Sequence, residues 1–279
     1  MRLSEIGELG LLAELERRGL ARGIENDAAQ LEGGLVVTQD ALVEGVHFRL
    51  DWTTHRELGY KAAAVNLSDL AASGADPQAL LVGLGAPGET ELDDVLELYA
   101  GLNEPGVPIV GGDTTRAESL YLSVTALGRS ERVPGRDGAK PGDRLVVTGP
   151  LGMAGAAFRA GRHARPPLRL EEGRRLAAVA HALIDVSDGL AVDAGHLADR
   201  SGCRIVIELE RVPLAPGATV DDLGFGEDYE LLAATPDPLE FAVIGRCEEG
   251  KGLEIRRDGN PVALSGWDHF DGQGAENLR

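Results

Sequence analysis

The segment HRELGYKAAAVNLSDLAASGA (55–75), followed by ALLVGLG (79–85), decides the fold class of this chain. The first stretch is rich in small residues and closes on Gly74, which is typical of a helix that ends at a glycine. The second stretch is a short apolar run, which is typical of a buried strand. A helix followed directly by a strand predicts a protein in which helices cover a sheet.

The same alternation continues on both sides of this segment. Apolar residues at helical spacing predict a helix over 4–18 that stops at Gly19, and the acid-first stretch 89–102 predicts another helix. GLVVTQDALVEGVHF (34–48) predicts a strand that leads into a polar loop. Other helices are expected at 169–183, at 190–200 and after a strand at 144–149, and other strands at 107–115, 119–128, 203–209, 229–235 and 241–247.

The stretch SERVPGRDGAKPGD (130–143) is rich in glycine, proline and charge, and it predicts a domain boundary. We place the boundary so that residues 1–134 form an N-terminal domain and residues 135–279 form a C-terminal domain. Strands and helices alternate in both halves, so the fold class is α/β or α+β. We find no tandem repeat and no low-complexity tract.

The composition is that of an acidic globular protein of 279 residues and 29.3 kDa, with 43% hydrophobic residues. Lys and Arg number 27 and Asp and Glu number 46, so the net charge is 27 − 46 = −19. This charge repels phosphates, so we expect no nucleic-acid partner and no anionic membrane partner unless cations intervene. Glycine is abundant (38 residues) and aromatics are scarce (4%), which favours binding by close backbone approach over aromatic stacking.

Sequence features of membrane and secreted proteins are missing. No apolar run approaches the ~18 residues that span a bilayer, and MRLSEIGELG (1–10) lacks the apolar core of a signal peptide. Cys203 and Cys247 are far apart and form no CxxC pair, which excludes a zinc knuckle and argues against a disulfide framework. We therefore expect a reduced, cytoplasmic protein.

Two glycine motifs resemble nucleotide-binding loops but fail on chemistry. GLGAPG (83–88) fits G-x-G-x-x-G, yet the helix after it opens with four acids that would repel a pyrophosphate, so a structural turn is the better interpretation. GRCEEGKG (245–252) fits G-x-x-x-x-G-K, but Gly252 replaces the magnesium-binding hydroxyl, so we expect a surface loop. The six histidines show no zinc-binding spacing.

Aspartates beside small residues recur after apolar runs. They are Asp27, Asp40, Asp69, Asp113, Asp185 and Asp188. Any one of them could simply cap a helix or make a turn. Together they offer the hard oxygen ligands that Mg²⁺ prefers, above all when phosphates complete its coordination shell.

The scarcity of lysines indicates what these aspartates could bind. The chain has only three lysines, Lys61, Lys140 and Lys251, so it cannot hold a polyphosphate with lysines. It can do so with aspartates if magnesium ions lie between carboxylate and phosphate. Phosphoryl transfer is mostly positioning and charge neutralisation, and no Ser-His-Asp or Cys-His order is visible. The residues therefore predict a magnesium-dependent enzyme that acts on phosphates.

An ordered series of motifs resembles the thiamine-monophosphate kinase family over about residues 24–270. The longest motifs are KAAAVNLSDLAASGADP (61–77) and VGGDTTR (110–116). The remaining blocks, in order, are ENDAA, TQDALVEGVHF, GAKPGDRLVVTGPLG, IDVSDGL, GEDYEL and WDHF. Related enzymes of the aminoimidazole ribonucleotide synthetase-like superfamily share the GGD block, whereas EGVHF, GEDYEL and WDHF favour the thiamine branch.

This resemblance implies a fold and a reaction. The fold has two domains, and the N-terminal sheet pairs with its copy in a homodimer, forming a barrel-like interface near the nucleotide. The reaction converts ATP and thiamine monophosphate into ADP and thiamine diphosphate by direct in-line transfer, since the acceptor phosphate is already nucleophilic. The implied cofactor is Mg²⁺, in several ions, with ATP as co-substrate.

The resemblance also implies roles for individual residues. The implied magnesium ligands are Asn26, Asp27, Thr38, Gln39, Asp40, Asp69, Asp113, Asp185 and Asp188, and the implied catalytic residues among them are Asp40, Asp69 and Asp113. The implied nucleotide contacts are Tyr99, Gly112, Asp113, Arg136 and Ser187. The implied substrate contacts are His47, Glu227 and Trp267. For Arg136 the alternative is a solvated linker residue, and for Trp267 it is packing of the C-terminal tail.

Some positions depart from the family pattern and keep other functions open. Asn26 stands where the family usually has a first aspartate, Gln39 stands where Thr or Ser is usual, and Phe225 replaces a glycine. The segment NEPG (103–106) is also shorter than usual. The alternatives are a nucleotide-binding homologue that has lost its chemistry and a sister-family synthase acting on another phosphate acceptor. A dinucleotide-dependent oxidoreductase is a further alternative, and GLGAPG is the only motif that supports it.

Overall fold

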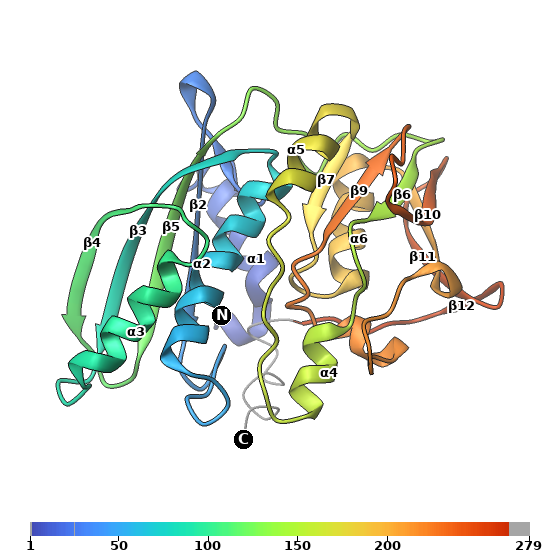
Figure 1. Cartoon of the computed structure of the whole chain (residues 1–279). Coiled ribbons are helices and arrows are strands. Elements are labelled where there is room, and N and C mark those ends of the chain that lie inside the picture. Colours follow the sequence, from blue (N-terminus) through green and yellow to red (C-terminus); the bar gives the residue numbers. More distant parts are fainter. Residues whose placement is uncertain (1, 25, 268–279) are drawn as a thin grey trace.

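Two β-sheets, one from each half of the chain, form the framework of the molecule (Figure 1). The computed structural model describes residues 2–24 and 26–267. The segment 130–143 carries no helix or strand and connects the two sheets. The result is a two-part α+β fold, as the alternation of elements predicts.

The first sheet has the strand order β1-β2-β5-β3-β4. Its strands are β1 (Ala29–Gln30), β2 (Leu35–Val43), β3 (Asp76–Ala86), β4 (Ile109–Arg116) and β5 (Tyr121–Arg129). β3 and β4 run parallel and the other neighbours are antiparallel. The helices α2 (His55–Ala72) and α3 (Leu92–Asn103) pack on one face of this sheet, and α1 (Leu3–Arg17) precedes it in the chain (Figure 1).

The second sheet has the strand order β12-β11-β8-β10-β6-β9-β7. Its strands are β6 (Arg144–Val147), β7 (Ala182–Asp185), β8 (Arg204–Glu208), β9 (Leu231–Thr235), β10 (Ala242–Glu248), β11 (Gly252–Arg257) and β12 (Asn260–Val262). β8 and β11 are parallel neighbours, and the other neighbouring pairs among these described strands are antiparallel. The helices of this half are α4 (Met153–Arg159), α5 (Leu170–Val179) and α6 (Leu190–Ser201).

Helix α2 is buried along most of its length because it packs against both halves. It begins with a capping box, in which Thr54 accepts a hydrogen bond from the Glu57 amide (3.2 Å) and the Glu57 carboxylate accepts one from the Thr54 amide (3.0 Å). Its C-terminal Ala71 and Ala72 share a core cluster with Val146 of β6 and other residues of the second half. The helix therefore carries its polar residues to the junction of the two halves.

Helices α2 and α3 approach closely because a glycine lies at each contact. A Cβ atom on Gly59 would lie 1.9 Å from the carbonyl oxygen of Leu98, and one on Gly101 would lie 1.9 Å from that of Arg56. Any side chain at either position would force the two helices apart. The small residues that first indicated this helix are thus required by its packing.

Most predicted elements are found, with a few differences. The helix expected at 169–183 ends at Val179, because residues 182–185 pair with β9 and form β7. Gly7 (φ 65°) interrupts α1, and the short β11 and β12 were not predicted. None of the helices in residues 2–24 and 26–267 is long and apolar enough to cross a membrane.

Candidate active site

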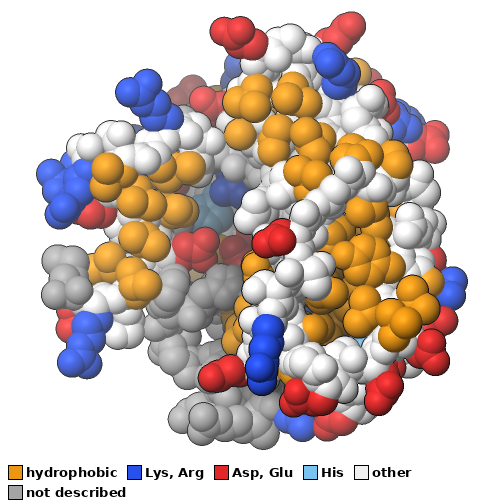
Figure 2. All heavy atoms as spheres, turned by 90° about the vertical axis from the view of Figure 1, so that its left-hand side faces the viewer, with side chains coloured by type: hydrophobic (Ala, Val, Ile, Leu, Met, Phe, Trp, Pro, Cys, Tyr) orange, Lys and Arg blue, Asp and Glu red, His pale blue; other side chains and the backbone are white. Residues whose placement is uncertain are grey.

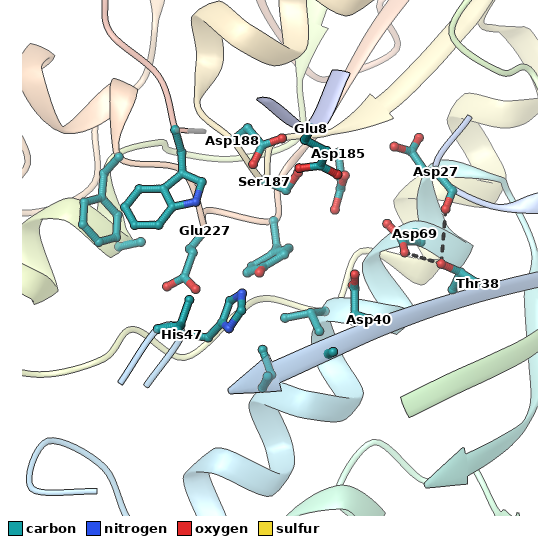
Figure 3. Close-up of a pocket in the computed structure, with 18 of the residues that line it drawn as sticks. Glu8, Asp27, Thr38, Asp40, His47, Asp69, Asp185, Ser187, Asp188 and Glu227 are labelled. Atoms are coloured by element: carbon teal, nitrogen blue, oxygen red, sulfur yellow. Dashed lines mark hydrogen bonds between the residues drawn. The ribbon is translucent and has the colours of Figure 1, made fainter. Parts of the chain in front are cut away.

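A pocket of about 450 Å³ lies where the two halves of the chain meet. It brings together most of the predicted site residues, which come from β2, α2, the segment after β7, the loop before β9 and the end of the described chain (Figure 3). Those that line it are Asn26, Asp27, Thr38, Gln39, Asp40, His47, Asp69, Arg136, Asp185, Ser187, Asp188, Glu227 and Trp267.

Carboxylates gather at one end of this pocket, which we call the acidic end (Asp27, Asp40, Asp69, Asp185 and Asp188). Carboxylate oxygens of Asp27, Asp69 and Asp185 lie within 4.8 Å of one another. In Figure 3 the side chain of Asp40 points from β2 toward this group. Residues that are distant in sequence thus form one cluster of hard oxygen ligands.

Hydroxyl groups hold two of these carboxylates in place. The Thr38 hydroxyl lies 2.5 Å from Asp69 Oδ2 and 3.2 Å from the carbonyl oxygen of Asp27. The Ser68 hydroxyl donates to Asp185 Oδ2 over 2.5 Å, which connects α2 with the end of β7. Both donors favour the ionised form of the acid that they contact.

Burial and mutual repulsion nevertheless make these acids hard to ionise. Burial raises the pKa of Asp185 to about 8, and the nearby Asp27 and Asp40 carboxylates add to the shift. Burial is also the main reason why the pKa of Asp69 lies well above its ordinary value. The negative charges of Asp40, Asp185 and Asp27 raise this pKa further. Clustered acids with raised pKa values are characteristic of functional sites, where a bound cation can compensate the charge.

Arg136 is the cation of the acidic end. Its guanidinium pairs with Asp27, and its backbone amide donates to the side-chain oxygen of Asn26 over 2.9 Å. Its Nε atom is buried and has no hydrogen-bond partner among the described residues. The predicted alternative of a solvated linker arginine is therefore wrong, because the side chain is packed inside the pocket.

The donors of the acidic end fit magnesium. Mg²⁺ prefers carboxylate, hydroxyl and water oxygens, and it keeps open positions for phosphate. Asp27, Asp69 and Asp185 supply three carboxylates whose oxygen atoms lie within 4.8 Å of one another, so this group could hold a metal ion. The raised pKa values of Asp69 and Asp185 indicate that the site lacks enough positive charge of its own, which a divalent ion would supply.

The opposite end of the pocket, which we call the recognition end, has a different chemistry. His47 and Glu227 face each other there beside an indole ring (Figure 3). Phe158 and Phe225 also line this end and stack at a tilt, with ring centroids 4.9 Å apart. Lys61 donates a hydrogen bond to Glu227, with its Nζ atom 2.6 Å from Glu227 Oε1. This end can hold a flat organic group that carries hydrogen-bond donors.

Backbone hydrogen bonds hold the recognition end together. The Glu227 amide donates to the Ser187 carbonyl (2.8 Å), and the Trp267 amide donates to the Asp188 carbonyl (3.0 Å). The turn before Glu227 passes so close to Ser187 that a Cβ on Gly226 would lie 2.2 Å from its carbonyl oxygen. Of the WDHF block, Trp267 lines the pocket and residues 268–270 lie outside the described residues.

Three predicted residues, Tyr99, Gly112 and Asp113, lie outside this pocket. Tyr99 packs against the core from α3. In β4, Asp113 is in register with Gly83, whereas Gly112 is in register with the buried Val82. Paired residues share one face of a sheet. Asp113 therefore points to the face opposite α2, which we call the outer face, and one chain does not bring it to the acidic end.

The same strand pairing explains why residue 112 is a glycine and on which face of the sheet the Gln39 side chain lies. A Cβ on Gly112 would lie 1.9 Å from the carbonyl oxygen of Val82, so the strand pairing itself requires glycine there. Gln39 lines the pocket from β2, but its side-chain oxygen accepts a hydrogen bond from the Thr125 hydroxyl over 3.0 Å. Thr125 pairs with Gln39 across the strands, so this side chain also lies on the outer face.

Some pocket residues were not predicted. Glu8 reaches the pocket from α1 (Figure 3), and nothing in its helical context marks it. Arg162 and His163 line the pocket in a basic stretch, and such a stretch is unusual in so acidic a chain. Tyr229 lies inside the GEDYEL block. The last three could have been found from these signals.

The two rejected glycine motifs are structural. Residues 83–86 of GLGAPG lie in β3, and Pro87 and Gly88 lead into the turn before α3, so the motif is the expected structural turn after a strand rather than a phosphate loop. The GRCEEGKG stretch runs from β10 through a turn into β11. Neither motif lines the pocket described above.

Comparison with known proteins agrees with this arrangement. The N-terminal domain of AIR synthase related protein matches residues 25–130, and its C-terminal domain matches residues 140–255. Thiamine-monophosphate kinase of Aquifex aeolicus (strain VF5) is 35% identical, with 97% of this chain and 100% of that protein covered. The kinase of the same name from Salmonella typhimurium (strain LT2) is 35% identical, with 95% and 98% covered.

A solved structure has the same fold. AaThiL complexed with AMPPCP and TMP superposes with a TM-score of 0.89 at 35% identity, covering 96% of this chain and 99% of that one. Identity at this level over nearly the full length of both chains shows common family membership. The chain belongs to the thiamine-monophosphate kinase family, within the group of AIR synthase related proteins.

Proposed function

We propose that this protein phosphorylates thiamine monophosphate with ATP and produces thiamine diphosphate and ADP. The observation that carries this proposal is one pocket with a carboxylate cluster at one end and an aromatic, hydrogen-bonding end opposite. A relative with the same fold has been solved with AMPPCP and TMP, which supports an ATP-like and a thiamine-phosphate ligand for this site.

The acidic end would hold more than one Mg²⁺ ion. Asp27, Asp69 and Asp185 are the best-placed ligands, with Asp40, Asp188 and the Thr38 hydroxyl beside them. When bound, magnesium supplies the positive charge that phosphates need beside these carboxylates and that stabilises the transferring phosphoryl oxygens. The Asn26 oxygen already accepts a hydrogen bond from the Arg136 amide, so it is a weaker candidate than the sequence implies.

The protein's own residues would position the two phosphates for direct transfer. Arg136 offers a planar guanidinium beside Asp27, which suits bidentate binding of phosphate oxygens. Ser187 and Asp188 follow β7 at the edge of the same cavity, where the nucleotide is expected. The acceptor phosphate is nucleophilic without a strong base, so no phosphoenzyme is needed.

The recognition end would bind the thiamine rings. Glu227 and His47 offer polar contacts, and the Trp267 indole offers an aromatic face for a cationic thiazolium or an electron-poor pyrimidine. Phe158 and Phe225 close this end with apolar surface. The elongated pocket would thus orient the substrate with its phosphate toward the acidic end.

We also propose that the protein works as a homodimer formed through the first sheet. In the described part of the chain, β4 pairs only with β3, and β2 pairs with β1 only at Val36 and Val37, so two strand edges remain open. Val110 of β4 is 64% exposed, and Figure 2 shows hydrophobic side chains gathered on the β4 side of the molecule beside a hollow. Joining these edges between two copies would close a barrel and remove both edges.

This dimer gives Asp113 a role that a single chain does not. Pairing of β4 with β2 of a second copy would bring the partner's Asp113 to the outer face of β2, where the Gln39 side chain also lies. We expect Val110→Glu to give monomers with little turnover, and Leu96→Glu on α3, also exposed, to leave the dimer intact. Sedimentation of both variants beside activity tests this, and a fully active wild-type monomer would refute the dimer proposal.

Two further expectations complete the proposal. The division into residues 1–134 and 135–279 is supported by the two separate sheets and by the family matches on either side of 130–143. The cytoplasmic location remains a prediction from the sequence.

Product analysis tests the proposed reaction directly. Incubation with ATP, Mg²⁺ and thiamine monophosphate should give thiamine diphosphate and ADP in equal amounts, and ATP alone should leave no phosphorylated protein. Nucleotide binding without product would identify a homologue that has lost its chemistry. Transfer to a different phosphate acceptor would identify a sister-family enzyme instead.

A further inference from the structure

Lys61 is a buried cation next to the recognition end, and no role has been assigned to it above. It lies on α2, and its side chain is only 5% exposed. Its Nζ atom donates to Glu227 Oε1 over 2.6 Å and to the backbone carbonyl oxygen of His47 over 3.0 Å. One ammonium group therefore contacts both segments that supply the predicted polar substrate contacts.

The surroundings of Lys61 include a second, much smaller cavity. This second cavity, lined by Lys61, Thr53, Glu57 and His163 among others, measures only about 30 Å³, which is space for a water molecule and not for a ligand. Burying an ammonium is costly unless it is paired and hydrogen-bonded. The chain has three lysines in all, and this one is buried against Glu227.

Glu227 has an unusual backbone conformation. Its φ of 56° lies in the left-handed region, and it follows Gly226 with φ 81°. Such a backbone persists when the surrounding contacts over-determine it. Lys61 engages Oε1, while the Glu227 side chain keeps 27% exposure and lines the pocket. The second carboxylate oxygen is the one left for a donor group on the substrate.

We propose that Lys61 is a positioning residue for the organic part of the substrate. It fixes the orientation of Glu227 and ties the His47 segment of the first half to the Glu227 turn of the second half. The inference rests on the proposed function and extends it, because it assigns the geometry of the recognition end to a residue that touches no substrate itself. A purely structural ion pair would affect folding stability and leave substrate affinity alone.

The test is a comparison of kinetic constants in Lys61→Met, with Lys140→Met as the matched control at an exposed lysine. We expect Lys61→Met to raise the KM for thiamine monophosphate about tenfold or more, because Glu227 loses its orienting partner. The KM for ATP should stay within about twofold of the wild-type value, since the acidic end is untouched. The control should change neither constant.

A double variant separates positioning from folding. Lys61→Met combined with Glu227→Gln removes both charges, so it leaves no unpaired buried charge even where Lys61→Met alone is unstable. If Lys61 acts through Glu227, adding Lys61→Met to Glu227→Gln should cause no further rise in the KM for thiamine monophosphate. Thermal melts of all variants identify those that fold.

Three outcomes would overturn the proposal. In the first, Lys61→Met melts earlier but keeps both wild-type KM values. In the second, the effects of Lys61→Met and Glu227→Gln multiply. In the third, the two KM values rise equally. A wild-type protein that fails to phosphorylate thiamine monophosphate would instead refute the proposed function, and this inference with it.

Discussion

The two ends of the pocket differ in how the negative charge of their carboxylates is neutralised. At the acidic end, Asp27, Asp69 and Asp185 crowd within 4.8 Å, and burial raises the pKa of Asp69 and of Asp185. At the recognition end, the Glu227 carboxylate already has Lys61 at 2.6 Å. One end needs external cations, whereas the other is neutralised by the chain itself.

This difference separates two tasks within one cavity. Carboxylates without enough cations can bind metal ions, and through them phosphates. A carboxylate that is already paired is held in a fixed orientation and can recognise a neutral donor group. Changes at the acidic end should therefore affect catalysis and metal dependence, and changes at the recognition end should affect the affinity for the thiamine substrate.

The largest expected effect is that of Asp69→Asn. Losing one charge from the acidic end should lower kcat by about 100-fold or more, the size of effect seen when one preorganised electrostatic contact is removed. The same change should raise the melting temperature in chelator, because it relieves repulsion among buried carboxylates. Steady-state kinetics and thermal melts measure both effects.

The control for this variant is Asp93→Asn, an exposed acid in the first turn of α3. It should leave kcat unchanged. If Asp69→Asn keeps wild-type turnover, the acidic end does not carry the chemistry and the contrast between the two ends fails.

A smaller effect should appear in the pH dependence of stability. The pKa of Asp185 rises from 3.8 to about 8 in the folded protein, so between these values the folded state binds more protons than the unfolded state. The melting temperature in chelator should therefore fall as the pH rises from about 5 to about 8. Mg²⁺ should reduce this fall, because metal binding favours the ionised carboxylates.

The matched variant for this measurement is Asp185→Asn, which removes the titrating group. Its melting temperature should depend less on pH than that of the wild-type protein. A wild-type melting temperature that rises over this range would contradict the description of the acidic end.

The smallest effect is expected for Asn26→Asp. Asn26 lines the pocket, and its side-chain oxygen accepts the hydrogen bond from the Arg136 amide, which an aspartate oxygen can also accept. The added charge should lower the Mg²⁺ concentration for half-maximal activity by a few fold, roughly the gain of one more carboxylate near the ions. An unchanged midpoint in a magnesium titration would mean that Asn26 serves only to hold Arg136.

Local patterns predicted much of this molecule because they act over short distances. Helix α2 was predicted from its small residues and the glycine at its end, and the structure adds a capping box of Thr54 and Glu57, which acts equally locally. The aspartates stood out because each follows an apolar run beside small residues. The family resemblance then grouped them into one site, as the structure shows for Asp27, Asp69 and Asp185.

Features set by pairing between distant segments could not be predicted in this way. Asp113 and Asp40 belong to the same sheet, but the strand register places their side chains on opposite faces. A register shift of one residue in β4 would move the Asp113 side chain to the face of Asp40. Lys61 and Glu227 are 166 residues apart in the chain, so only the packing of α2 against the second half brings them together. The metal-ligand role that the resemblance implies for Asn26 stays a prediction, and its hydrogen bond to the Arg136 amide could not be foreseen from the sequence.

The measurement that tests the central claim most directly is the proton balance of magnesium binding. Mg²⁺ is titrated at pH 7 into the protein with a non-hydrolysable ATP analogue, and the heat is compared in two buffers of different ionisation enthalpy, after subtraction of the analogue alone. Because the pKa of Asp185 is about 8, binding should release about one proton or more from the wild-type protein. Asp185→Asn should bind Mg²⁺ more weakly and release fewer protons. Magnesium binding without proton release, equally tight in both proteins, would show that the ions do not bind at the acidic end.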